Sequence, residues 1–178
     1  MTRGQGSSNM RNFVLGFLAA FFVLPGGCVV LFVLGLSPIN ADSSPSATET
    51  AMLQSAVRRS VRRSSADIPS PPPATEDAFV EGGKLYVAGC AGCHGGLGGR
   101  VREDNDHFPP VPQLPHVGTQ YSEPELYWIV KHGIRMTSMS AYGPFYSEKQ
   151  LWSLAAFLRR INNLPPDIVD KIRAKKVG

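Results

Sequence analysis

Apolar residues are concentrated in one uninterrupted block near the N-terminus of the chain. Residues 14–36 contain no charged side chain and consist largely of Leu, Val and Phe. A helix of this length, rising about 1.5 Å per residue, can cross a hydrocarbon core of about 30 Å. A signal peptide has a shorter apolar region followed by small residues, and residues 39–41 could form such a cleavage site. The length of the block favours a retained transmembrane helix.

The basic residues on either side of this block predict its orientation. Arg3 and Arg11 precede it, and no Lys or Arg follows it until Arg58. Because Lys and Arg close to a membrane span favour the cytoplasmic side, we expect residues 1–13 to be cytoplasmic. The remainder would then lie across the membrane, as in a single-pass protein of the cell inner membrane with its main domain on the periplasmic side.

The next segment, residues 37–74, has the composition of a linker. It is rich in Ser, Ala, Thr and Pro and ends in the run Ser70-Pro-Pro-Pro73. One interpretation of residues 51–63 is a short basic amphipathic helix that could lie on anionic lipid. The low apolar content favours the other interpretation, a solvated and flexible tether.

Helical spacing of apolar residues returns after residue 75 and predicts three helices. The first covers residues 76–88. The second begins at Ser122 and the third at Ser147, and in each a Glu or Gln three positions later completes a capping box. Gly133 is expected to end the second helix, and Pro165-Pro166 the third.

Between the first two helices, residues 95–121 contain Gly and Pro throughout and show no strand alternation, so we expect a long loop there. The predicted fold class is therefore all-α. A domain over residues 76–165 with three short helices and such a loop cannot build much core from its own side chains. A large apolar group at its centre would remove this shortage.

The net charge of +4 does not indicate a nucleic-acid partner. The excess positive charge lies in the linker arginines and in the basic C-terminal tail, residues 166–178. Residues 76–165 are nearly neutral, and no basic patch with interleaved aromatic residues is present. Nucleic acid is therefore not expected as a partner.

Candidate chemistry is concentrated in Cys90-Ala-Gly-Cys93-His94. A structural zinc site needs about four ligands, but the remaining cysteine, Cys28, falls in the apolar block. A redox-active Cys-x-x-Cys belongs to a strand–helix unit, and no strand is predicted here. A disulfide would leave His94 unexplained. The remaining interpretation is one haem c, attached covalently through both cysteines and ligated by His94.

A second axial ligand must come from another part of the chain. His and Met are the residue types that supply it in c-type haem proteins. A thioether is a soft ligand that favours ferrous iron and raises the reduction potential. The candidates are His107, His116, His132, Met136 and Met139.

Three motifs resemble those of the small single-haem class I cytochromes c, especially the bacterial members. Gly82-x-x-x-Tyr86-x-x-x-Cys90-x-x-Cys93-His94 resembles their opening helix and haem-attachment motif. Leu154-Ala-Ala-Phe157-Leu-Arg-Arg160 resembles their last helix, in which Phe157 would be the aromatic partner of the first helix. The stretch from Gly133 to Tyr142 is similar to their methionine-bearing loop.

This resemblance covers residues 76–165 and implies the cytochrome c fold, electron transfer, and His94 and Met139 as axial ligands. Ser138 and Ser140 replace the Gly and Pro that usually flank the methionine, so Met136 stays the alternative to Met139.

Another short motif, Pro112-Gln-Leu114, resembles the family's Pro-x-Leu step. The resemblance implies that the Pro112 carbonyl accepts the Nδ1 proton of His94 and that Leu114 also borders the haem. Pro109, Pro110 and Pro115 are rivals for this role.

Taken together, these patterns predict a membrane-tethered monohaem c-type cytochrome that is not an enzyme. It would carry single electrons between membrane redox complexes or other cytochromes and bind no small-molecule substrate. One alternative is a haem c subunit fixed within a larger respiratory or dehydrogenase complex. Another is an open-site haem enzyme or gas sensor, which requires that Met139 does not bind the iron.

Overall fold

A computed structural model describes residues 5–36, 43, 45–98 and 110–174, without the side chains of residues 5–8, 24, 25 and 28. The chain divides into two compact units, Met1–Asn40 and Ala41–Gly178. His107 and Pro109, two of the residues considered above, lie outside the described residues.

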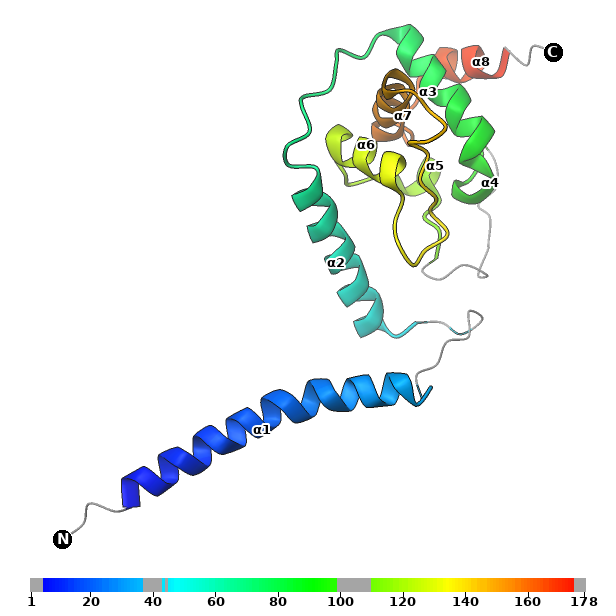
Figure 1. Cartoon of the computed structure of the whole chain (residues 1–178). Coiled ribbons are helices and arrows are strands. Elements are labelled where there is room, and N and C mark those ends of the chain that lie inside the picture. The colour runs from blue at the N-terminus through cyan, green and yellow to red at the C-terminus, as the bar shows by residue number, and fades with distance from the viewer. Residues whose placement is uncertain (1–4, 37–42, 44, 99–109, 175–178) are drawn as a thin grey trace. The chain divides into compact units, whose positions relative to one another are not determined.

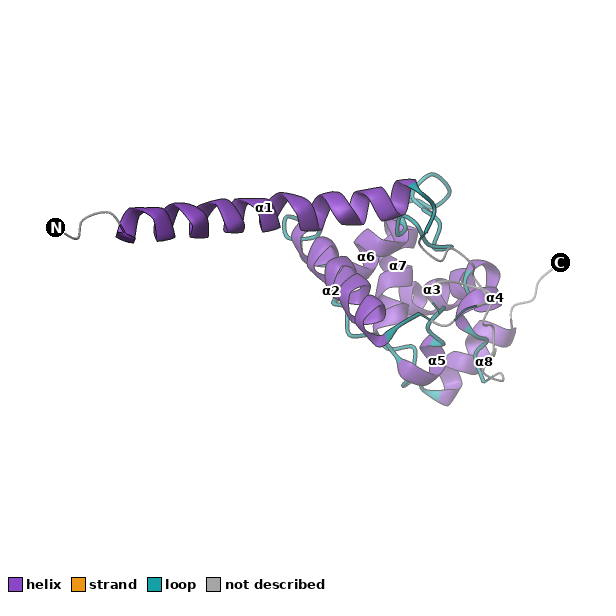
Figure 2. Ribbon diagram, turned by 90° about the horizontal axis from the view of Figure 1, so that it is seen from below, coloured by secondary structure: helices purple, strands orange, loops and turns teal. Residues whose placement is uncertain are grey.

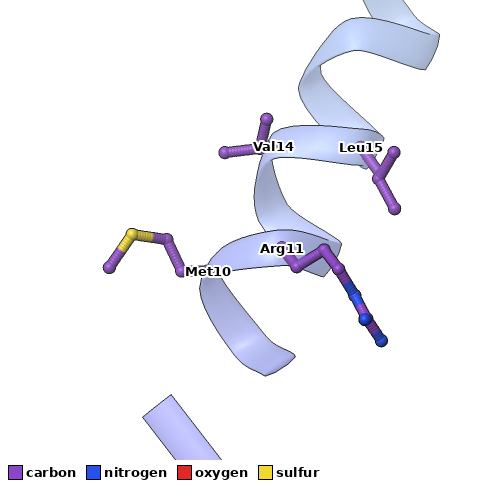
Figure 3. Close-up of a pocket in the computed structure, with 4 residues that line it drawn as sticks. All are labelled: Met10, Arg11, Val14 and Leu15. Atoms are coloured by element: carbon purple, nitrogen blue, oxygen red, sulfur yellow. The ribbon is translucent and has the colours of Figure 1, made fainter. Parts of the chain in front are cut away.

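The first unit contains one helix, α1 (Gln5–Val33) (Figure 1). Its apolar side chains are exposed along the whole helix, and Phe13 and Phe32 are 75% and 73% exposed. Figure 3 shows a shallow depression near its start, where Met10, Arg11, Val14 and Leu15 project from successive turns.

The membrane prediction for this unit is not supported. Within the described residues, no helix combines the length and the apolar character that crossing a membrane requires. The apolar block over residues 14–36 does fall largely inside α1, but its assignment as a transmembrane helix stays a prediction.

The second unit is built from helices joined by loops, and its described part contains no strand (Figure 2). This confirms the predicted all-α class. The helices are α2 (Ala47–Ser64), α3 (Glu76–Gly89), α4 (Ala91–His94), α5 (Leu114–Val117), α6 (Glu123–His132), α7 (Glu148–Arg159) and α8 (Pro166–Ala174).

The core of this unit is the contact between α3 and α7, which lie against each other. A Cβ atom on Gly82 would lie 2.0 Å from the backbone oxygen of Ser153, so only glycine allows the two backbones to approach this closely. Tyr86 and Phe157 are fully buried, with ring centroids 5.6 Å apart. This is the aromatic pairing that the resemblance implied.

Both predicted capping boxes are present. The backbone N–H of Ser122 donates to Glu125 Oε2 at 2.7 Å, and that of Ser147 donates to Gln150 Oε1 at 2.9 Å. The second helix ends before Gly133, whose positive φ of +68° favours glycine at this position. Local sequence therefore determines where α6 and α7 begin.

The end of the third predicted helix differs from the prediction. α7 ends at Arg159, and Pro166 is the first residue of a further helix, α8. Proline is well tolerated at a first helical position because the N–H it lacks has no partner there. Ile168 and Ile172 are buried, and Arg173 donates to the Leu97 carbonyl at 2.8 Å. Most of the segment interpreted as a tail therefore packs on the domain.

The favoured interpretation of residues 51–63 as a solvated tether was wrong, because they lie in the helix α2, as the alternative interpretation expected. The first turn of α2 is capped by Ser46, whose Oγ accepts from the backbone N–H of Glu49 at 3.1 Å. Val61 is only 1% exposed, and Nε of Arg62 lies 3.8 Å from Oε1 of Glu125 on α6. The part of residues 37–74 between Ala47 and Ser64 is thus a helix, and its C-terminal half docks against α6.

Candidate haem site

The two cysteines and the histidine lie on one short turn that follows α3 directly. The backbone N–H of Cys90 donates to Tyr86 O at 2.8 Å, which joins this turn to the end of α3. Cys90 O then accepts from the backbone N–H groups of Cys93 and His94, at 3.1 and 2.9 Å. The three functional side chains are therefore presented by the single helical turn that includes α4.

The two thiols lie in different environments. Both are free, but Cys90 is buried whereas Cys93 is exposed. Burial, with a smaller contribution from the neighbouring Cys93, raises the pKa of the Cys90 thiol to about 11. The ionised thiolate is therefore costly in this place, and a thioether, which has no proton to lose, suits the apolar surroundings.

The imidazole of His94 is oriented by a backbone carbonyl. Its Nδ1 lies 3.0 Å from the carbonyl oxygen of Pro112. Desolvation lowers the pKa of His94, and this hydrogen bond partly opposes the effect. Since a carbonyl can only accept, the neutral ring carries its proton on Nδ1, which leaves the lone pair of Nε2 for a metal.

The segment that carries Pro112 is joined to the attachment turn by one further hydrogen bond, and a second bond joins the end of that turn to α3. Gln113 Nε2 donates to the Cys93 carbonyl at 3.0 Å. The hydroxyl of Tyr86 donates to the Gly95 carbonyl at 2.6 Å in a buried contact. Leu114 follows and is partly buried against the core. The Pro112–Leu114 step is thereby held beside His94.

The loop after α6 separates its two methionines. Ile134 N–H donates to Met139 O at 3.0 Å, and Met139 N–H donates to Thr137 Oγ1 at 3.1 Å. Met139 is partly buried, whereas Met136 is 92% exposed and has a φ of +61°. The loop thus holds Met139 with polar contacts and turns Met136 to solvent.

Within the described residues, the two histidine candidates for the second ligand are at the surface. His116 is exposed at the end of α5. His132 is exposed at the end of α6, and its ring centroid lies 5.1 Å from that of Trp128. These positions do not favour either histidine over Met139.

A tyrosine connects the methionine loop to the attachment turn. The Tyr142 hydroxyl donates to the Gly89 carbonyl at 2.9 Å, directly before Cys90. Its backbone N–H donates to Val130 O at 2.9 Å. Sequence reasoning placed Tyr142 close to the ligand loop but missed this hydrogen bond and the one from Gln113, because no spacing rule links side chains so far apart in the chain.

The chain matches a model of a known protein family over these same elements. Residues 77–158 match the family described as cytochrome C oxidase, cbb3-type, subunit III. This range contains the attachment turn, the Pro112 step, both methionines and most of α7.

Residues 77–158 are a class I cytochrome c domain. No significant match to a curated protein or to a solved structure is found. The helices α2 and α8 lie outside the matched range.

The side chains of the cytochrome c domain fit a haem better than a bare metal ion. In the described part of the chain, no group of three or more His, Cys, Asp or Glu residues is placed to hold a metal. The domain instead offers two thiols and an oriented imidazole on one turn, and a thioether on a loop tied to that turn. Such a set suits covalent attachment with two axial ligands.

Proposed function

We propose that the chain is a membrane-tethered monohaem cytochrome that carries single electrons between redox complexes or other cytochromes. Cys90 and Cys93 would hold one haem c covalently, and His94 and Met139 would be its axial ligands. When bound, that haem supplies a reversible one-electron change at iron. The observation that carries the proposal is the contact between His94 Nδ1 and Pro112 O, because it leaves Nε2 available in a family built around such a histidine.

The surrounding residues favour electron transfer over substrate chemistry. A hydrogen bond from Nδ1 makes the imidazole a stronger and better-oriented donor. The Met139 loop is held by Thr137 and Ile134, so a thioether is presented without large rearrangement. With both axial positions filled, no substrate would reach the iron, and the protein would not be an enzyme.

Two features support the tether. The apolar side chains of α1 are exposed along its length and meet no other element of their own unit. Arg3 and Arg11 near the N-terminus favour a cytoplasmic start. We therefore propose a location at the cell inner membrane with the cytochrome domain on the periplasmic side.

The second candidate function is that of a haem c subunit fixed within a larger oxidase complex. It is favoured by the family description, which names a subunit of a cbb3-type cytochrome c oxidase. In that case the same haem would relay electrons inside the assembly. Purification in mild detergent distinguishes the two: a single cytochrome chain supports the carrier, and stoichiometric partner subunits support the complex.

Absorption spectra of the oxidised and reduced full-length protein test the haem site itself. The proposal expects a low-spin c-type spectrum with the far-red band of methionine bound to ferric iron, and no rapid binding of CO by the reduced protein. Met139→Leu should remove that band, and the matched variant Met136→Leu should retain it. A high-spin spectrum or rapid CO binding in the unmodified protein would instead support an open-site enzyme or sensor.

A further inference from the structure

The helix α2 carries arginines both beside its buried face and on the side opposite to that face. Its sequence contains Arg58, Arg59, Arg62 and Arg63, against a single acidic residue, Glu49. Val61 marks the face that is buried against α6. Residues two positions away lie about 200° around a helix, so Arg59 and Arg63 point away from the domain.

The four arginines fall into two pairs with different surroundings. Nε of Arg62 lies 3.8 Å from Oε1 of Glu125. Burial raises the pKa of Tyr121, and the positive charge of Arg58 partly opposes this effect. These two arginines are directed at the domain. Arg59 and Arg63 are exposed and have no ion-pair partner within the described residues.

An apolar side chain continues the outward face toward the start of α2. Met52 lies seven residues before Arg59 and four before Ala56, so all three share one side of the helix. Met52 is 68% exposed. We call this row of Met52, Ala56, Arg59 and Arg63 the outer stripe of α2.

We propose that the outer stripe is a contact surface for an anionic lipid bilayer, while the opposite face of α2 stays docked on α6. Arginines attract anionic headgroups, and a flexible thioether can enter the headgroup region. A helix bound on both faces would orient the cytochrome domain relative to the membrane, which a flexible tether cannot do.

Chain connectivity favours lipid over an acidic protein. About 13 residues, 34–46, separate α1 from α2, and a chain of that length spans at most about 45 Å. This step rests on the proposed membrane tether. If α1 is held in a bilayer, α2 always remains near its surface, where the local concentration of headgroups is high.

The test uses full-length protein in nanodiscs of phosphatidylcholine, with or without about one third phosphatidylglycerol, and measures amide hydrogen exchange of α2. We expect exchange to slow in the anionic discs and to recover in high salt, which screens exposed charges. An arginine near such a surface increases the membrane-binding constant about fivefold. Loss of two arginines in R59Q/R63Q should therefore weaken the protection on the order of 30-fold. The matched variant K149Q/R159Q, which removes two exposed charges from α7, should keep it.

Equal exchange in the two kinds of disc, or full protection in R59Q/R63Q, would overturn the lipid proposal. Protection by soluble polyglutamate but not by anionic discs would also overturn it and would assign the outer stripe to an acidic protein. Failure of the protein to enter phosphatidylcholine discs would contradict the proposed membrane tether but not the proposed lipid contact of the outer stripe. Sedimentation of the full chain with phosphatidylglycerol vesicles, compared with R59Q/R63Q, then decides the lipid proposal separately.

Discussion

The α3–α7 contact and the ligand-bearing segments of the cytochrome domain are built in different ways. Between α3 and α7 the contact is apolar and very close, with Gly82 against Ser153 and Tyr86 against Phe157. The ligand-bearing segments are held mainly by single hydrogen bonds to backbone carbonyls, such as those of Cys93 and Gly89. This difference favours a core formed by the helix pair itself, whereas the proposed haem would supply the interior of the other half.

The largest effect is expected from removing both attachment thiols. In Cys90→Ala/Cys93→Ala, no haem should stay bound after denaturation, and the ligand-bearing half should lose most of its ordered structure. The reason is that this half has few apolar contacts of its own. Near-UV circular dichroism and haem staining of denaturing gels measure both outcomes. Retention of covalent haem by this variant would contradict the assignment of Cys90 and Cys93.

A substitution at the helix contact should be the next most damaging. Gly82→Ala places a methyl group 2.0 Å from the backbone oxygen of Ser153, so α3 and α7 must separate. We expect a loss of about 3 kcal/mol in the free energy of unfolding, measured by denaturant titration of the haem-loaded protein. Gly92→Ala is the control, because a methyl group there meets nothing within 4 Å. Equal effects of the two substitutions would rule out the close-contact explanation.

A smaller effect is expected where the two halves of the site are tied together. Tyr142→Phe removes the hydrogen bond to the Gly89 carbonyl, at a cost of about 1 kcal/mol. We also expect methionine ligation to be lost earlier, either as the pH is raised or as denaturant is added. The far-red band measures this loss. Tyr146→Phe keeps the stacked ring pair and is the matched control. Identical behaviour of both variants would show that the Tyr142 hydroxyl does not hold the loop.

The smallest effect concerns an ion pair on the surface of the helical half. Lys131 and Tyr127 both donate to Glu148, and these bonds lower the pKa of Glu148. A lowered carboxyl pKa adds stability above the ordinary pKa, and this stability is lost as the pH falls through the lowered value. Glu148→Gln should therefore cost at most about 1 kcal/mol near neutral pH and flatten the stability profile below about pH 4.5. Asp170→Asn, an exposed residue on α8, should leave the profile unchanged.

The helical half was largely predictable because its signals are local. The capping boxes at Ser122 and Ser147 and the glycine at position 133 act through backbone groups a few residues away, and all three have the expected roles. The prediction failed where a helix carries few apolar residues. Among the described residues, Ile168 and Ile172 are the buried residues of α8 and Val61 is the buried residue of α2, so neither helix stands out from composition alone.

The ligand-bearing half was predictable in part from motif spacing and in part from family resemblance. Spacing identified Cys90, Cys93 and His94, but the choice of Pro112 and Met139 came from similarity to known loops. The structure places the Pro112 carbonyl beside His94 and leaves Met136 exposed. The contacts of Gln113 and Tyr142 join segments 20 and 53 residues apart, and no local rule predicts them.

We propose that this chain forms its interior around one covalently attached porphyrin. Mass spectrometry of the full-length protein, produced in cells that attach haem c and then denatured, tests it most directly. We expect a mass increase of one haem, located on the peptide that contains Cys90 and Cys93. An unmodified mass with both thiols free to react with an alkylating reagent would contradict it.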